Sequence, residues 1–163
     1  MRAADDPPRN EAEAEFQRCV ERRLARHDAA LVEVLAVVVA HDYPPEVAGV
    51  SFEVFSDGFL DHFPVHMYLM AEDDDWLDEG SFPPPVAPGL LELDGVYGPE
   101  LPQTLHASSP ESDDWALATE TMIRWFAERW RAAGGAQFDR RAWIQHHDDG
   151  TRFDLVAGKW HAN

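Results

Sequence analysis

Hydrophobic residues recur at two different spacings along this chain, and the order of those spacings limits its fold more than any other feature. From Glu11 to about Ala40 they recur every three to four residues, the pattern of a helix with one buried face. A second run of this kind follows a capping residue, Ser112 or Asp113, and ends near Ala133 at a glycine pair. The sequence therefore predicts two long helices, the first with a candidate kink near Asp28.

Alternating apolar and polar residues, the period of a β-strand, mark two pairs of shorter segments, one after each predicted helix. Each pair flanks an Asp-Gly dipeptide, which is typical of a hairpin turn. Pro64 lies inside one segment and cannot donate a hydrogen bond to a neighbouring strand, so we expect that strand at the edge of the sheet. The predicted strands are residues 50–55 and 62–70 in the first pair and residues 142–147 and 151–156 in the second.

Residues 71–110 contain seven of the twelve prolines and many acidic residues. A structureless stretch of this length is uncommon inside a small domain, although Leu90 to Leu93 offer a further short strand or a docking segment. We expect a single domain over residues 1–163, with a mobile N-terminus at residues 1–10. The predicted fold class is α+β: an antiparallel sheet built from two β-hairpins, two long helices packed on one face, and a long Pro-rich acidic insert at residues 71–110.

Charge is distributed unevenly along the chain, which holds 31 Asp or Glu residues, 13 Lys or Arg residues and a net charge of −18. The 97 residues from His27 to Ile123 contain 20 acidic residues and no Lys or Arg. Nucleic acids and anionic membranes would be repelled by such a protein, so we exclude both as direct partners. The charge predicts a basic protein as the partner.

The densest acidic segment is residues 72–79, where six carboxylates in eight residues surround Trp76 and Leu77. One interpretation is a solvated loop that only keeps the protein soluble. The other is a binding face, because no Lys or Arg lies closer than 45 residues to offset the repulsion, and because the indole offers apolar area for a partner to bury. The predicted partner-binding residues are Glu72, Asp73, Asp74, Asp75, Trp76, Asp78 and Glu79.

Motifs of several common enzyme classes are missing from the sequence. It has no nucleophile elbow Gly-x-Ser-x-Gly, no phosphate-binding Gly-x-x-x-x-Gly-Lys loop and no dinucleotide-binding Gly-x-Gly-x-x-Gly. Cys19 is the single cysteine, which excludes a disulfide within the chain and a Cys-based zinc site, and fits a reducing compartment. No apolar segment approaches the roughly 20 residues of a membrane-spanning helix, so we expect a cytoplasmic protein.

Histidines supply the main alternative, a small metal- or ligand-binding enzyme. His146 and His147 precede two aspartates, and His66 lies on a predicted strand. Histidine and aspartate are both metal ligands and general bases, so this alternative uses His66, His146 or His147 with a carboxylate such as Asp148. Neighbouring strand residues point to opposite faces, however, and the Asp-Gly pair is already explained by its turn.

The leading hypothesis is a non-enzymatic, cytoplasmic, acidic binding protein that captures a basic partner protein through the middle of its chain. One concrete version is an immunity or inhibitor protein that covers the cationic cleft of a nuclease-type toxin, with its carboxylates in place of phosphates. This hypothesis predicts no catalytic residue, no metal and no cofactor. A third possibility is a subunit of a larger assembly, with residues 71–110 docked as an arm on a neighbouring chain.

Overall fold

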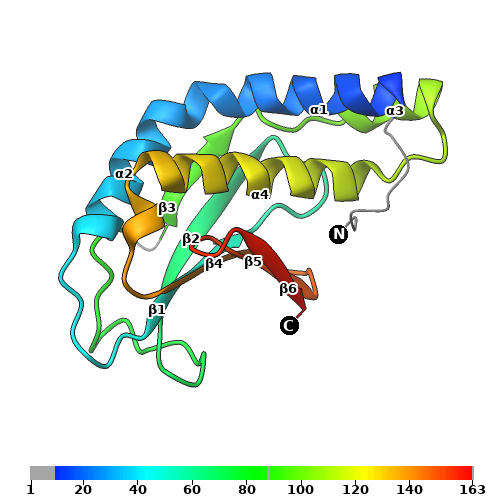
Figure 1. Ribbon diagram of the computed structural model, residues 1–163. Coiled ribbons are helices and arrows are strands. Elements are labelled where there is room, and N and C mark those ends of the chain that lie inside the picture. The colour runs from blue at the N-terminus through cyan, green and yellow to red at the C-terminus, as the bar shows by residue number, and fades with distance from the viewer. Residues whose placement is uncertain (1–9, 88, 163) are drawn as a thin grey trace.

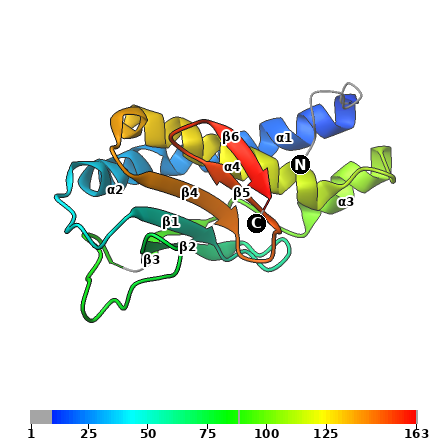
Figure 2. The ribbon, with the colours of Figure 1, turned by 60° about the horizontal axis from the view of Figure 1, so that its bottom comes forward.

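A six-stranded mixed β-sheet forms one layer of the protein, and helices cover one of its faces (Figures 1 and 2). The computed structural model describes residues 10–87 and 89–162. The strands lie in the order β3-β2-β1-β4-β5-β6. Their bounds are β1 Gly49–Val54, β2 His62–Met70, β3 Gly89–Asp94, β4 Arg141–His146, β5 Thr151–Asp154 and β6 Lys159–Ala162. The covering helices are α1 Glu11–Leu24, α2 Asp28–Ala40 and α4 Asp114–Ala132, which gives the α+β class that the sequence predicts.

The first predicted helix is α1 and α2 joined by a short turn of 3-10 helix at Ala25–His27. Asn10 begins α1 with a capping box, in which its side chain accepts a hydrogen bond from the Glu13 N–H and the Glu13 carboxylate accepts one from the Asn10 N–H. The kink predicted near Asp28 is confirmed. The Asp28 carboxylate, in the first turn of α2, forms an ion pair of 2.6 Å with Arg129 of α4.

Helix α4 matches the second predicted helix closely at both ends. Asp113 caps it by accepting a hydrogen bond from a backbone N–H of the first turn. Gly134 follows its end with φ 93°, a left-handed conformation that glycine adopts without steric cost. The helix packs on the sheet through aromatic contacts, with Phe126 and Trp130 at ring-centroid distances of 5.0 and 5.8 Å from Phe52 of β1.

Strand β1 lies inside the sheet and pairs with strands from both halves of the chain. It is antiparallel to β2 and parallel to β4, with Val54 opposite His146. The prediction of an antiparallel sheet built from two β-hairpins is therefore wrong: the sheet is mixed, and β3 and β6 extend it at its edges. Local alternation indicates which segments are strands, but it does not encode which strand of the first half meets which strand of the second.

The prediction that the strand containing Pro64 lies at an edge is also wrong, since β2 sits between β1 and β3. The Pro64 carbonyl accepts a hydrogen bond of 3.0 Å from the N–H of Phe55, which lies one residue beyond the end of β1. In an antiparallel pair the N and C=O of one residue face the same neighbouring strand. The nitrogen of Pro64, which lacks a hydrogen, therefore also faces Phe55 at the end of β1. The interior strand tolerates proline because its ladder with β1 is ending there.

Residues 71–110 do not form one Pro-rich insert, contrary to the prediction. They contain β3, which is the short strand offered by Leu90 to Leu93, and helix α3 (Glu100–Ser108). Their irregular part is concentrated in the connection between β2 and β3. The predicted mobile segment at residues 1–10 falls outside the described residues except for its last member. Of the helices in the described part of the chain, none has the length and apolar character needed to cross a lipid bilayer.

Candidate functional site

Residues 72–79, here called the acidic loop, follow β2 and are anchored to the C-terminal strands. Asp74 has φ 68°, a left-handed conformation that Asp tolerates better than most residues. Its Oδ1 is 2.6 Å from Arg141 Nη1, and its Oδ2 is 3.1 Å from Arg152 Nη2. Arg141 also donates hydrogen bonds to the carbonyl oxygens of Ala71 and Glu72. Two arginines therefore clamp the acidic loop to the sheet.

The clamp corrects the expectation that no base offsets this segment. Arg141 and Arg152 lie 67 and 78 residues from Asp74 in the sequence, yet both contact its carboxylate. The sheet explains why, because Gly49 of β1 pairs with Met70 at the end of β2 on one side and with Arg141 at the start of β4 on the other. The acidic loop thus begins next to the first residue of β4.

Trp76 is exposed over 53% of its surface, as expected of an anchor. Its indole stacks on the ring of Tyr68, with centroids 4.0 Å apart and planes inclined by 3°. The backbones of Trp76 and Met70 also form an isolated β-bridge. Trp76 is therefore held in one orientation while it still offers apolar area to a partner. Trp160 of β6, by contrast, is half-buried, and its ring packs against Phe153.

The carboxylates of the acidic loop divide into two groups. Asp74 is held by the arginine clamp, and Asp78 accepts hydrogen bonds of 2.9 Å from both the N–H and the hydroxyl of Ser81. These two side chains shape the loop. The other four are Glu72, Asp73, Asp75 and Glu79, and all of them are exposed, as is Asp78. The exposed carboxylates and Trp76 together form the part of the acidic loop that a partner can reach.

A pocket of about 370 Å³ is lined by residues of both the acidic loop and the sheet, among them Trp76 and Arg152. The guanidinium of Arg152 lies 4.1 Å from the centroid of the Trp143 ring. Beside it, Gln145 donates a hydrogen bond of 2.6 Å to the Glu53 carboxylate. These contacts order the polar side chains on the sheet face opposite the helices, next to the acidic loop.

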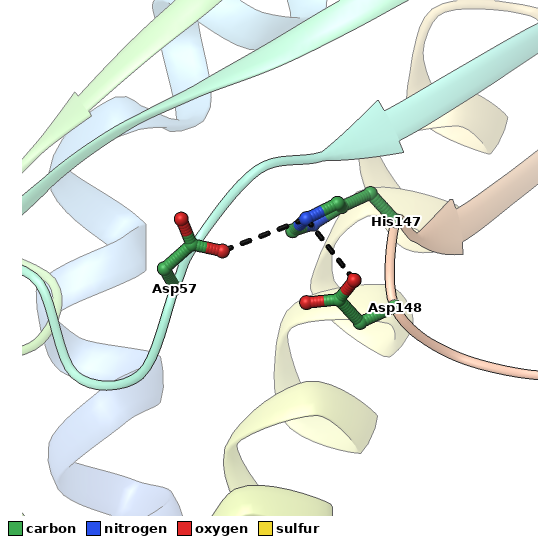
Figure 3. A group of neighbouring side chains, drawn as sticks. All are labelled: Asp57, His147 and Asp148. Atoms are coloured by element: carbon green, nitrogen blue, oxygen red, sulfur yellow. Dashed lines mark ion pairs between the residues drawn. The ribbon is translucent and has the colours of Figure 1, made fainter.

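The carboxyl ends of β1 and β4 meet at one edge, because the two strands are parallel neighbours. Asp57 follows β1, while His147 and Asp148 follow β4. His147 Nε2 is 3.5 Å from Asp57 Oδ1 and 3.2 Å from Asp148 Oδ1 (Figure 3). One ligand atom from each of these three residues lies within 4.8 Å of the others. A single divalent cation could bridge such a set.

His146 does not belong to this group. Its Nε2 is hydrogen-bonded to Ser56 Oγ at 2.6 Å, and both residues are buried. Burial lowers the pKa of His146 to about 4, so its imidazole is neutral near pH 7. Its Nδ1 has no hydrogen-bond partner among the described residues. Because the pair is closed to solvent, we assign it to packing rather than to an accessible site.

His66 also lies apart from the carboxylates that flank His147. Its ring packs against Phe55 at 5.0 Å, and Phe55 in turn stacks on His147 at 4.9 Å. Of the three predicted histidines, only His147 is thus paired with carboxylates in the described part of the chain, and one of its partners, Asp57, is a residue that the sequence did not single out. The signal that would have found Asp57 is the parallel pairing of β1 with β4.

Comparisons with protein-family models, with curated proteins and with solved structures found no match to this chain. A function must therefore be inferred from the chain itself, and the acidic loop and the group formed by Asp57, His147 and Asp148 are two features that support such an inference.

Proposed function

We propose that this protein is a non-enzymatic binding protein that captures a basic partner protein through its acidic loop. The observation that carries the proposal is Trp76, stacked on Tyr68 and exposed over 53% of its surface, among five exposed carboxylates. Protein interfaces commonly combine a central aromatic anchor with a charged rim. The expected partner is a cationic protein, such as a nuclease-type toxin whose phosphate-binding cleft would accept carboxylates.

The net charge of −18 supports the same proposal, because it would speed the association of this protein with a cationic partner. Complementary fields raise association rate constants from roughly 10⁵–10⁶ to about 10⁸ M⁻¹s⁻¹ or more at low salt. The ion pairs of Asp74 with Arg141 and Arg152 order the acidic loop before a partner arrives, so less conformational entropy is lost on binding. A preformed acidic surface suits an inhibitor that has to act quickly.

The test is the association rate constant at increasing salt for the native protein and for the triple variant Asp73→Asn, Asp75→Asn and Glu79→Gln. The partner would be isolated from host extract on the immobilised protein at low salt and eluted at raised salt. We expect the variant to associate about 10-fold more slowly at low salt and to depend less on salt. Asp74 and Asp78 stay unchanged because they shape the loop.

A matched control removes three negative charges elsewhere, through Glu11→Gln, Glu21→Gln and Glu46→Gln. These side chains are exposed and lie outside the acidic loop. The control variant should associate nearly as fast as the native protein. Equal slowing of both triple variants would assign the effect to net charge and contradict a specific role of the acidic loop.

A second candidate function, binding of a divalent metal ion, is favoured by the group of Asp57, His147 and Asp148. One imidazole nitrogen and two carboxylates make a ligand set that suits zinc or manganese. The stacked ring of Phe55, 4.9 Å from His147, orients the imidazole. The sequence offered His66, His146 or His147 as the histidine of such a site. This candidate uses His147, because His146 is hydrogen-bonded to Ser56 instead.

Elemental analysis of the purified protein tests the second candidate. One equivalent of metal that disappears in the variant His147→Ala would support metal binding. A metal-free protein that also fails to bind added zinc would exclude it. Either result leaves the association experiment on the acidic loop unaffected.

A further inference from the structure

A second pocket, of about 470 Å³, lies between the first turns of α4 and the C-terminal strands. Its walls include Trp115 of α4 and Trp160 of β6, and Asp148 and Asp149 from the turn between β4 and β5. The volume falls within the range of small-molecule sites. Aromatic walls with a few polar groups are also typical of such sites.

This pocket and the acidic loop lie at opposite ends of β4. The acidic loop contacts Arg141, the first residue of the strand, whereas Asp148 follows its last residue, His146. Six strand residues span about 17 Å. The pocket is therefore separate from the acidic loop, although it shares Asp148 with the group around His147. An inference about it goes beyond the proposed capture of a basic partner.

Two hydroxyl groups in the pocket walls lack hydrogen bonds. Thr119 of α4 is only 7% exposed, and its Oγ1 has no partner among the described residues. Thr151, at the start of β5, has a buried Oγ1 that also lacks a hydrogen-bond partner among the described residues. Both residues line the pocket. Burying a hydroxyl without a hydrogen bond is unfavourable, so these two groups are available to bond with a ligand in the pocket.

The charge of the walls restricts what that ligand can be. Asp148 and Asp149 contribute negative charge, and none of the described residues that line the pocket is Lys, Arg or His. The N-terminus of α4 offers no anion site, because the Asp113 carboxylate already accepts a hydrogen bond of 2.9 Å from the Ala116 N–H. Carboxylates next to indole rings favour a cation, which is attracted both to the charge and to the ring face.

We propose that this pocket binds the primary ammonium group of an aliphatic amine. An ammonium group has three N–H donors and no acceptor. It matches a pocket whose polar groups include the carboxylates of Asp148 and Asp149 and the unpartnered hydroxyls of Thr119 and Thr151, all of which can accept. The methylene groups of the amine would pack on the indole of Trp115. The ammonium group can belong to a free polyamine or to a lysine side chain of a partner protein.

Calorimetric titration of the full chain at low salt distinguishes these two sources. The titrants are spermidine, the peptide acetyl-Gly-Lys-Gly-amide, and the uncharged 1,4-butanediol. We expect one saturable site for at least one of the two amines and none for the diol. Binding of spermidine alone assigns the pocket to free amines, and binding of the peptide assigns it to lysine side chains. Failure of both amines to saturate, or equal binding of the diol, would overturn the proposal.

The variant Thr119→Val tests the unpartnered hydroxyl without changing the shape of the side chain. We expect the dissociation constant of the amine to rise about 10-fold. The Tm should not fall, because the hydroxyl of Thr119 has no hydrogen-bond partner in the free protein to lose. Thr121→Val is the matched control on the same helix: its hydroxyl donates to the Leu117 carbonyl at 2.7 Å and accepts from Gln17 at 3.0 Å. The control should lower Tm and leave amine affinity unchanged, and the reverse pattern would contradict the proposal.

Two double variants that remove the same charge distinguish the effect of the pocket on amine affinity from the effect of the net charge. Asp148→Asn with Asp149→Asn should weaken amine binding by about 10-fold or more. Asn at position 149 keeps the oxygen that accepts a hydrogen bond of 3.1 Å from the Thr151 N–H, so the turn is preserved. Asp73→Asn with Asp75→Asn removes the same charge from the acidic loop and should change amine affinity by less than about 2-fold. Equal weakening in both double variants would overturn the assignment to this pocket.

Discussion

Asp74 and Arg141, 67 residues apart in the sequence, form an ion pair of 2.6 Å that ties the acidic loop to the start of β4. Asp74→Asn removes this charge but keeps a residue that tolerates φ 68°. Because both side chains are 33% exposed, we expect the free energy of unfolding to fall by about 1 kcal/mol. Urea denaturation measures it, with the exposed Asp73→Asn as the control. Equal effects of the two variants would mean that the clamp adds no stability.

Gly135 lies against the fully buried indole of Trp130, and a Cβ atom at position 135 would overlap that ring. Gly135→Ala should destabilise the fold by about 1–3 kcal/mol, because a close-packed core leaves the indole little room to move. Gly150→Ala is the matched control, since nothing lies within 4 Å of a Cβ atom there. Thermal unfolding compares the two variants. Similar Tm values would contradict tight packing around Trp130.

The lowered pKa of His146 predicts that the folded protein loses stability as the pH falls. Burial lowers its pKa to about 4 in the folded protein, from the ordinary value of 6.5 expected in the unfolded chain. Between these values the unfolded chain binds a proton that the folded protein does not. The stability linked to His146 is therefore fully present above pH 6.5 and falls as the pH drops towards 4, by up to about 3 kcal/mol.

Denaturation at pH 7 and at pH 4 checks this linkage with two substitutions. His146→Gln does not titrate, so its free energy of unfolding should decrease less between the two pH values than that of the native protein. His41→Gln, at an exposed position, should retain the full native decrease. A decrease in His146→Gln as large as in the native protein would show that other groups cause the acid sensitivity.

Trp76→Ala should weaken partner binding much more than it weakens folding. An aromatic anchor contributes about 2 kcal/mol or more to binding, which corresponds to a roughly 30-fold loss of affinity. The Tm should change little, because 53% of the side chain is exposed in the free protein. Leu60→Ala is the control: this side chain is 51% exposed and lies between β1 and β2, outside the acidic loop. Comparable affinity losses in both variants would remove Trp76 from the proposed interface.

The elements with a strong local period were predictable from the sequence. The strand at residues 62–70 was predicted with the bounds it has in the structure, and the helix capped by Asp113 was placed nearly as well. One α-helix and one strand of the described chain were missed. Strand β6 has only four residues, and Trp160 is the one large apolar side chain among them, so no alternation can be recognised. Helix α3 follows Pro99 and carries Pro102 in its first turn, and prolines at such positions resemble a loop in the sequence.

The exposed tryptophan of the acidic loop was also predictable, because an indole among carboxylates is a local feature. The arginines that clamp the loop were not, since their contact with Asp74 depends on the pairing of Gly49 with Arg141. The meeting of Asp57 with His147 depends on the same pairing of β1 with β4. Local patterns carry no information about contacts between segments so far apart in the chain.

The parallel contact between β1 and β4 has a consequence for biosynthesis. Residues 49–54 leave the ribosome long before residues 141–146, so for much of translation the nascent β1 lacks one of its two neighbours. Phe52 on the inner face of β1 also lacks its contact with Phe126 until α4 has been made. Of the 20 carboxylates between His27 and Ile123, a stretch without Lys or Arg, 15 are synthesised after β1 and before β4. Their charge disfavours association between unfinished copies while the fold is still incomplete.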